Sequence, residues 1–163
     1  MFIDFQGSIC IILGLKKSLT KYFWINVMKK KYYFNALIEH TNFQPTYKYK
    51  EHIVYLASYP ERNSGLWKLN DKEIFRKYIS SLNELYPNFN EKDINWHRVF
   101  KEEDGLIYKK GLLKNMPSLK SPIKGLFVCG MMCGYPDREI ERMARISKRS
   151  VGLCVEYLNH MGP

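Results

Sequence analysis

The segment between Asn70 and Pro87 most constrains the fold, because it predicts an amphipathic helix with one wide apolar face. Asn70 and Glu73, three residues apart, form a capping pair at its start, and Pro87 ends it. The apolar side chains recur with the 3.6-residue period of a helix: Ile74, Phe75, Tyr78, Ile79, Leu82, Leu85 and Tyr86. Such a face must be buried against another layer, so we expect a helix packed on a sheet.

The first half of the chain supplies strand-like segments for that sheet. Ile9–Leu15 is a continuous apolar run, which is typical of a strand covered on both faces. Tyr22–Val27 and Phe34–His40 predict the two strands of a hairpin. His52–Tyr59 is rich in β-branched and aromatic residues and predicts a strand that ends before Pro60.

The stretch after the helix is less regular. Trp96–Phe100 and Leu106–Tyr108 predict two short strands around a turn at Glu102–Gly105, whose carboxylates we interpret as a polar turn. Lys114–Lys124 contains two prolines and predicts a loop. We therefore expect an α+β fold with a mostly antiparallel sheet.

The last third predicts a strand, a glycine-containing loop and a long helix. Leu126–Cys129 reads as a short buried strand, and the helix is expected to start near Asp137. Its predicted apolar face consists of Ile140, Met143, Ala144, Val151, Cys154, Val155 and Leu158.

The start of this last helix is a candidate anion site. The first amides of a helix have no partner within it, and its dipole places partial positive charge there. Arg138 adds a full positive charge, and Asp137 can cap the amides or accept a hydrogen bond from a ligand hydroxyl. Many strand–loop–helix turns bind nothing, so this pattern alone leaves both interpretations open.

Composition excludes two classes of protein. With 45% apolar and 15% aromatic residues among 163, the chain has the composition of a folded domain and not of a disordered one. Its longest apolar run, Ile9–Leu15, is far shorter than the roughly 20 residues that span a bilayer. We therefore expect a cytoplasmic protein without a membrane span. The four cysteines are predicted to be buried in the core.

The net charge of +10 is compatible with nucleic-acid binding. Lys29–Tyr33 and Tyr47–Lys50 interleave cations with aromatic rings. The basic residues are nevertheless spread along the whole chain, and the densest cluster falls in the expected hairpin loop. This distribution favours a solvated basic surface over a nucleic-acid groove.

The sequence contains no recognisable catalytic or metal constellation. Its four histidines, His40, His52, His97 and His160, lack the spacing of metal ligands, so no metal site is expected. The G-x-S-x-G motif of serine hydrolases does not occur. No catalytic residue is assigned.

The last third also carries a family resemblance. Leu126–Gly130, followed by Tyr135-Pro136-Asp137-Arg138, resembles the C-terminal flavin-contacting segment of FAD-dependent amine-oxidase-like proteins. That superfamily includes monoamine oxidases, protoporphyrinogen oxidases, phytoene desaturases and UDP-galactopyranose mutases. Upstream, Gly7–Leu15, Phe34–Asn42 and His52–Tyr59 resemble successive strands of the substrate domain of that family.

The resemblance implies a site and a division of the chain. Gly130, Met131, Asp137 and Arg138 would contact FAD. Tyr135 and Pro136 would shape the loop that carries these contacts. Residues 1–123 would belong to the substrate domain, and residues 124–163 would be the C-terminal strand and helix of the FAD-binding domain. The chain departs from the family in having Met131 where many relatives have an acidic residue, and Glu139 where a glycine is usual.

A further departure concerns the cofactor. None of the ten glycines forms the G-x-G-x-x-G turn that holds the ADP half of FAD in the family. The resemblance thus implies a C-terminal fragment or subunit of an oxidoreductase that transfers a hydride from a small-molecule substrate to flavin. Alone, the chain is expected neither to hold FAD tightly nor to be active.

The resemblance also implies partners. A separate N-terminal Rossmann-domain chain would supply the missing motif, and apolar residues around Leu126–Cys129 would favour homo-oligomers. Two other functions stay open. One is a part of a nucleotide-sugar mutase-like flavoprotein, and the other is a non-catalytic basic binding module.

Overall fold

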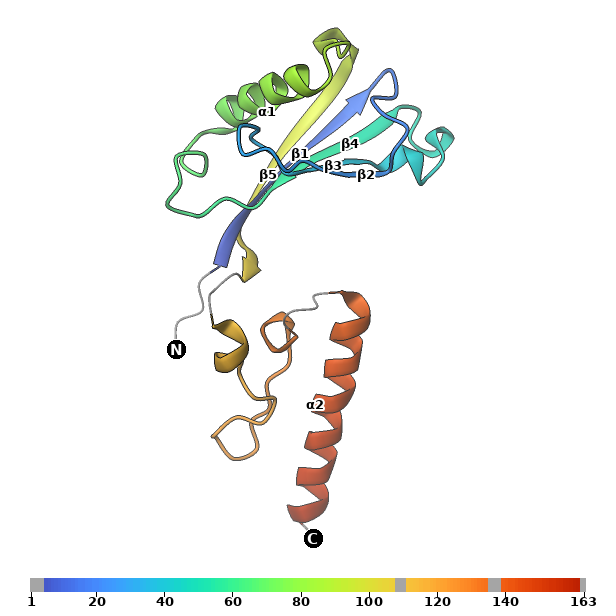
Figure 1. The fold of residues 1–163 in the computed structure, drawn as a ribbon. Coiled ribbons are helices and arrows are strands. Elements are labelled where there is room, and N and C mark those ends of the chain that lie inside the picture. The colour runs from blue at the N-terminus through green and yellow to red at the C-terminus, as the bar shows by residue number, and fades with distance from the viewer. Residues whose placement is uncertain (1–4, 108–110, 135–138, 162–163) are drawn as a thin grey trace. The chain divides into compact units, whose positions relative to one another are not determined.

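The structure, a computed structural model, describes residues 5–107, 111–134 and 139–161. These form two compact units, Met1–Ile107 and Tyr108–Pro163, each described by itself (Figure 1). The predicted division after residue 123 concerns function and stays a prediction. Among the described residues no helix combines the length and the apolar character that crossing a membrane requires.

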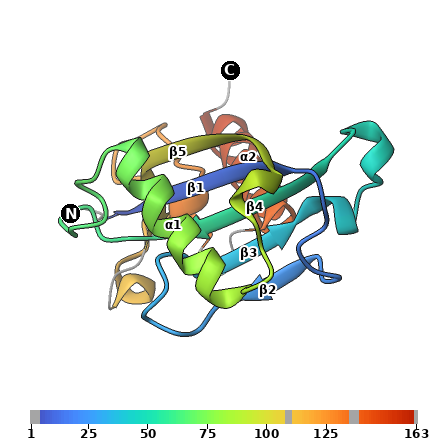
Figure 2. The ribbon, with the colours of Figure 1, turned by 90° about the horizontal axis from the view of Figure 1, so that it is seen from above.

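The first unit is a five-stranded sheet in which every pair of neighbours is antiparallel. The strand order is β2-β3-β4-β1-β5, so the two longest strands lie side by side at one edge. Helix α1 (Asp71–Leu85) lies across one face of this sheet (Figures 1 and 2). The strands are β1 (Phe5–Leu15), β2 (Trp24–Asn26), β3 (Ala36–Glu39), β4 (His52–Ser58) and β5 (Ile94–Ile107). The α+β class and the predicted hairpin are confirmed.

The core lies between α1 and the sheet. Ile9, Ile11 and Leu13 alternate along β1 and are fully buried beneath Ile74 and Leu82 of the helix. Burial of each such side chain contributes roughly 1.5–3 kcal/mol.

Both halves of the predicted capping box form. The Asn70 side chain accepts from the Glu73 amide, and the Glu73 carboxylate accepts from the Asn70 amide, both at 3.0 Å. The register of α1 is therefore fixed at its first turn.

The prediction that Ile9–Leu15 is covered on both faces is wrong. Cys10 and Ile12, which alternate with the buried residues, are only half-buried. Within the described part of the first unit, no helix lies on that face. The continuous apolar run reflects an apolar but open sheet face.

The predicted turn at Glu102–Gly105 is also wrong, because β5 runs unbroken through it. The strand pairs with β1 on both sides of an irregularity between Gln6 and Ser8. The acidic side chains of Glu102, Glu103 and Asp104 are exposed, as is common on an edge strand that must avoid pairing with other chains. The sequence predicts a turn here because a polar edge strand can have the same amino-acid composition as a turn.

The second unit consists of short helical turns, extended segments and one long helix, α2 (Ile140–Met161). The predicted strand Leu126–Cys129 is an extended segment with a single bridge, between Phe127 and Lys120. Leu126 is 48% exposed. Short 3-10 helices complete the described parts of the two units: His40–Asn42, Thr46–Lys48, Glu91–Asp93, Leu112–Asn115 and Met131–Cys133.

Helix α2 is present as predicted, but its packed face is not the predicted one. Ile146 and Ser150 are buried, and Tyr157 packs its ring against Phe127 at a centroid distance of 5.8 Å. Four residues of the predicted apolar face are exposed by half or more: Ile140, Val151, Val155 and Leu158. The helix carries two apolar stripes, and periodicity alone does not tell which one the rest of the unit covers.

Candidate functional site

Of the six residues predicted to form the cofactor site, the structure describes Gly130 and Met131. Gly130 precedes the one-turn helix Met131–Cys133, and its carbonyl accepts from the Cys133 amide at 2.9 Å. Met131 is about half-exposed. Tyr135, Pro136, Asp137 and Arg138 lie outside the described residues, so their predicted roles stay predictions.

The surroundings of Gly130 fit a ligand that approaches the backbone. A Cβ placed on Gly130 would meet no heavy atom of the described structure within 4 Å. Open space beside a glycine is what the diphosphate of a dinucleotide requires, because its oxygens must reach the backbone amides. The described part of the segment is therefore compatible with the FAD contact that the resemblance implies.

The thiols around this segment differ in environment. Cys133 is buried, and burial, followed by the neighbouring Cys129, raises the pKa of its thiol. Cys129 is exposed, with its sulfur 3.3 Å from the Ser147 hydroxyl. The prediction that every cysteine lies in the core is thus wrong for Cys129. Cys10 and Cys154 are half-buried.

The open face of the sheet is the second candidate surface. The register places Trp24, Ile38, Tyr55 and Ile12 in one row across four strands. In the next row, Ala57, Cys10 and Phe100 are cross-strand neighbours. Trp24 and Phe100 are 53% and 47% exposed. We call these residues the open face: Cys10, Ile12, Trp24, Ile38, Tyr55, Ala57 and Phe100.

Two titratable groups lie on the open face. Burial raises the pKa of Cys10 to about 11. Burial also raises the pKa of the neighbouring Tyr55, and Cys10 and Tyr49 raise it further. Both groups therefore remain neutral near pH 7, and the face offers an apolar surface with a hydroxyl and a thiol as polar groups.

At the end of β1, the ring of Trp96 closes over the backbone of Gly14. A Cβ on Gly14 would lie 2.3 Å from the Trp96 indole nitrogen, so only glycine leaves room for this ring. The indole N–H donates to the Glu51 carboxylate at 2.7 Å. This contact fixes the large aromatic side chain at one border of the sheet.

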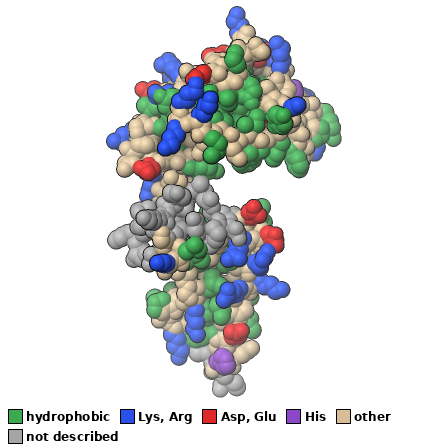
Figure 3. All heavy atoms as spheres, viewed as in Figure 1, with side chains coloured by type: hydrophobic (Ala, Val, Ile, Leu, Met, Phe, Trp, Pro, Cys, Tyr) green, Lys and Arg blue, Asp and Glu red, His purple; other side chains and the backbone are tan. Residues whose placement is uncertain are grey.

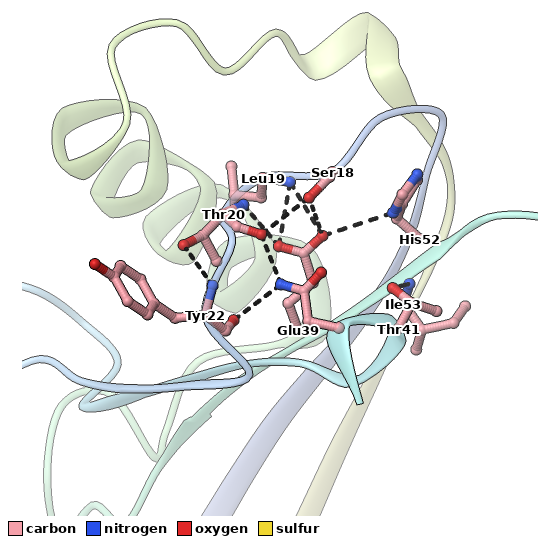
Figure 4. Close-up of polar contacts among 9 residues, drawn as sticks. Ser18, Leu19, Thr20, Tyr22, Glu39, Thr41, His52 and Ile53 are labelled. Atoms are coloured by element: carbon pink, nitrogen blue, oxygen red, sulfur yellow. Dashed lines mark hydrogen bonds and ion pairs between the residues drawn. The ribbon is translucent and has the colours of Figure 1, made fainter. Parts of the chain in front are cut away.

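A buried carboxylate organises the loop after β1 (Figure 4). Glu39, fully buried at the end of β3, accepts hydrogen bonds from the Ser18 hydroxyl and from the Thr20 amide, each at 2.7 Å. The Leu19 amide donates to the same carboxylate at 3.2 Å. His52 Nδ1 lies 3.7 Å away and has no hydrogen-bond partner among the described residues.

Neighbouring polar groups extend this network. The Asn42 side-chain amide donates to the backbone carbonyls of Thr20 and Tyr22 at 2.6 and 3.0 Å. Thr41 accepts from the Ile53 amide at 3.2 Å. The loop held in this way lines a cavity of about 290 Å³, where Ser18 and Leu19 face the end of α1. The network is thus structural support for a concave surface.

Sequence reasoning does not identify the role of Glu39. The available signal is a lone carboxylate that follows the apolar strand residues Ala36–Ile38. A charged side chain at the end of such a strand must be exposed or saturated with donors, and in this fold the donors come from a loop 19 or more residues upstream.

Comparison with known proteins places the fold. No protein-family model matches the sequence, and no curated protein matches it. Among solved structures, an oxidoreductase from Methanosarcina mazei is 17% identical with a TM-score of 0.65, over 92% of this chain and 35% of that one. A protein described as a protoporphyrinogen oxidase, from Exiguobacterium sp. 255-15, is 12% identical with a TM-score of 0.63, over 92% and 36%.

A third structure is more distant. Reduced UDP-galactopyranose mutase is 14% identical with a TM-score of 0.54, over 70% of this chain and 25% of that one. The chain thus spans between a quarter and a little over a third of the length of these structures. Its fold is similar to that of a part of each of these oxidoreductase and mutase structures.

Proposed function

We propose that the chain is the substrate-domain part, with a C-terminal cofactor-contacting segment, of an FAD-dependent oxidoreductase. The observation that carries this proposal is the fold match over 92% of the chain to two structures, of which it covers 36% and 35%. One is an oxidoreductase and the other is described as a protoporphyrinogen oxidase. Residues 1–123 would contribute the substrate side and residues 124–163 the cofactor side. The complete assembly would act in the cytoplasm.

The open face supports a role in substrate binding. It presents an apolar surface with the neutral Tyr55 hydroxyl and Cys10 thiol among its side chains. Ligand sites are typically apolar surfaces with a few placed polar groups. In the proposed enzyme this face would orient a small organic substrate and exclude water from it. FAD, when bound, would accept the hydride.

The predicted cofactor segment, which begins at Gly130, would bind the diphosphate of FAD. Open space beside Gly130 allows backbone amides to approach the phosphate oxygens. Arg138 would add a positive charge to that contact. Because the sequence has no G-x-G-x-x-G turn, this segment offers only a fraction of the contacts that dinucleotide binding uses.

The remaining contacts would come from a dinucleotide-binding domain outside residues 1–163. Helix α2 supports such a partner, because Ile140, Val151, Val155 and Leu158 form an apolar stripe that the described part of its own unit leaves exposed. An exposed apolar stripe of this kind is typical of an interface.

A second candidate function has support of its own. The match to reduced UDP-galactopyranose mutase makes a mutase-like flavoprotein part an alternative to the oxidoreductase. Such an enzyme would use reduced flavin without net oxidation of its substrate. Consumption of an electron acceptor by the assembled protein would distinguish the two, because only the oxidoreductase needs one.

The test is assembly with the chain encoded in the reading frame upstream of this one. We expect the purified pair to retain FAD through gel filtration and this chain alone to lose it. Arg138→Gln should weaken FAD retention by the pair about tenfold or more, because a charge-assisted phosphate contact is lost. Arg76→Gln removes an exposed charge from α1 and should change nothing. An upstream frame without a dinucleotide-binding motif, or a pair that binds no flavin, would contradict the proposal.

A further inference from the structure

The second unit contains a cavity of about 510 Å³ between the segment Met116–Lys120 and helix α2. Arg142, Arg145 and Arg149 line one wall of it. Their spacing of three and seven residues places them on the same face of the helix over two turns. Lys120 lines the cavity from the facing segment. We call this cavity the arginine pocket.

The cations of the arginine pocket are incompletely neutralised. Arg145 pairs with Glu141 on its own helix. For Arg142 and Arg149 no ion pair is formed within the described part of the chain. The Nε–H of Arg142 is shielded from solvent and donates to no described acceptor. A buried donor without an acceptor costs free energy, so a bound anion at this position would be stabilised.

The charge of the whole unit favours an anion. Ten Lys and Arg residues lie in Tyr108–Pro163 against four Asp and Glu, which gives this unit +6 of the net charge of +10. On the face of the unit seen in Figure 3, basic side chains are accordingly more plentiful than acidic ones. Such a field attracts anions before contact is made.

The shape of the pocket restricts the kind of anion. Ile146 and Leu153 line it together with the cations, so it combines apolar surface with guanidinium groups. Its volume lies within the roughly 300–1,000 Å³ that small-molecule sites occupy. A polynucleotide would need an extended basic groove with stacking rings instead. The two segments that interleave cations with aromatic rings, Lys29–Tyr33 and Tyr47–Lys50, belong to the first unit, where Lys31 pairs with Glu84.

We propose that the arginine pocket binds a small organic phosphate or diphosphate. Guanidinium groups of Arg142 and Arg149 hold the anionic group in paired hydrogen bonds. The organic part lies over Ile146 and Leu153. The pocket borders the Gly130 segment, because Cys133 of the one-turn helix Met131–Cys133 lines it. The proposal does not rest on the proposed flavin function, because its test contains no flavin.

The test is isothermal titration calorimetry of the full 163-residue chain with inorganic pyrophosphate and with ADP. We expect one site per chain and tighter binding of ADP, because pyrophosphate leaves the apolar lining uncovered. Arg149→Gln, at an exposed position, should raise Kd roughly tenfold or more. Arg142→Gln should do the same.

Lys148→Gln is the matched control, because Lys148 is adjacent to Arg149 on α2 but does not line the pocket. It should leave Kd within about twofold, since an exposed charge outside a site contributes little. Equal weakening by Lys148→Gln and Arg149→Gln would show diffuse attraction and overturn the proposal. Absence of binding at millimolar pyrophosphate and ADP would overturn it as well. So would tighter binding of a single-stranded oligonucleotide that all three variants weaken equally.

Discussion

The carboxylate of Glu39 accepts a hydrogen bond from the backbone amide of Thr20 at 2.7 Å, which ties the loop after β1 to the end of β3. Glu39 is fully buried, and its other donors, Ser18 and Leu19, belong to the same loop. A single carboxylate therefore accepts hydrogen bonds from two backbone amides and one hydroxyl of this loop.

The first prediction concerns this carboxylate. In Glu39→Gln one oxygen becomes an NH₂ group that faces donors, so hydrogen bonds are lost and donors are left buried. We expect the free energy of unfolding to fall by about 2 kcal/mol or more. Urea denaturation followed by circular dichroism measures it. Glu84→Gln, which breaks the half-exposed pair with Lys31, should cost less than about 1 kcal/mol. Equal losses would mean that the buried network contributes no more than a surface ion pair.

The second prediction concerns the close contact between β1 and β5. A Cβ on Gly105 would lie 2.8 Å from the Ser8 Cβ and 2.9 Å from its backbone nitrogen. Gly105→Ala should therefore force the strands apart and cost about 1–3 kcal/mol of unfolding free energy. Gly65→Ala is the control, because no atom lies within 4 Å of its Cβ position, and it should stay within about 0.5 kcal/mol of wild type. An unchanged free energy of unfolding in Gly105→Ala would contradict the close pairing of β1 with β5 at this position.

Sequence reasoning succeeds where local signals act alone. The Asn70–Glu73 capping box and the hairpin are encoded within a few residues, and both are present. The sequence pattern divides β5 wrongly at Glu102–Gly105, because only its pairing with the distant β1 distinguishes an acidic edge strand from a turn. Which stripe of α2 is buried depends likewise on a distant segment, since Tyr157 packs against Phe127.

The third prediction tests that packed stripe. Ile146→Ala should remove buried contacts and cost about 2 kcal/mol or more, whereas Val155→Ala, at a half-exposed position, should cost less than about 0.5 kcal/mol. Hydrogen exchange of the α2 amides measures the stability of this unit directly. Faster exchange in Val155→Ala than in Ile146→Ala would mean that the face expected from periodicity is the packed one.

The fourth prediction concerns pH and the thiols. Burial raises the pKa of Cys10 to about 11 and raises that of Cys133, so both remain protonated at pH 8 and react slowly, since the thiolate is the nucleophile. Exposed Cys129 should be alkylated first by iodoacetamide. Peptide mapping by mass spectrometry gives the order. The Cys10 rate should rise with pH up to about 11. Cys10 reacting at pH 8 as fast as Cys129 would contradict its buried environment.

The candidate sites differ in how far the sequence alone can predict them, because some depend on contacts between distant segments. A resemblance in residue order predicts Gly130 and Met131 as cofactor contacts, and that stays a prediction. The open face and the arginine pocket depend instead on register and on packing within each unit. Cys10, Tyr55 and Phe100 become neighbours only when three strands pair.

The absorbance spectrum of the purified chain, alone and after assembly with a chain that carries a dinucleotide-binding motif, tests the central claim most directly. We predict that the chain alone is colourless and that the assembled pair shows the visible bands of bound flavin. A chain that is yellow by itself, with close to one FAD per polypeptide, would contradict the claim that it holds only part of the cofactor site.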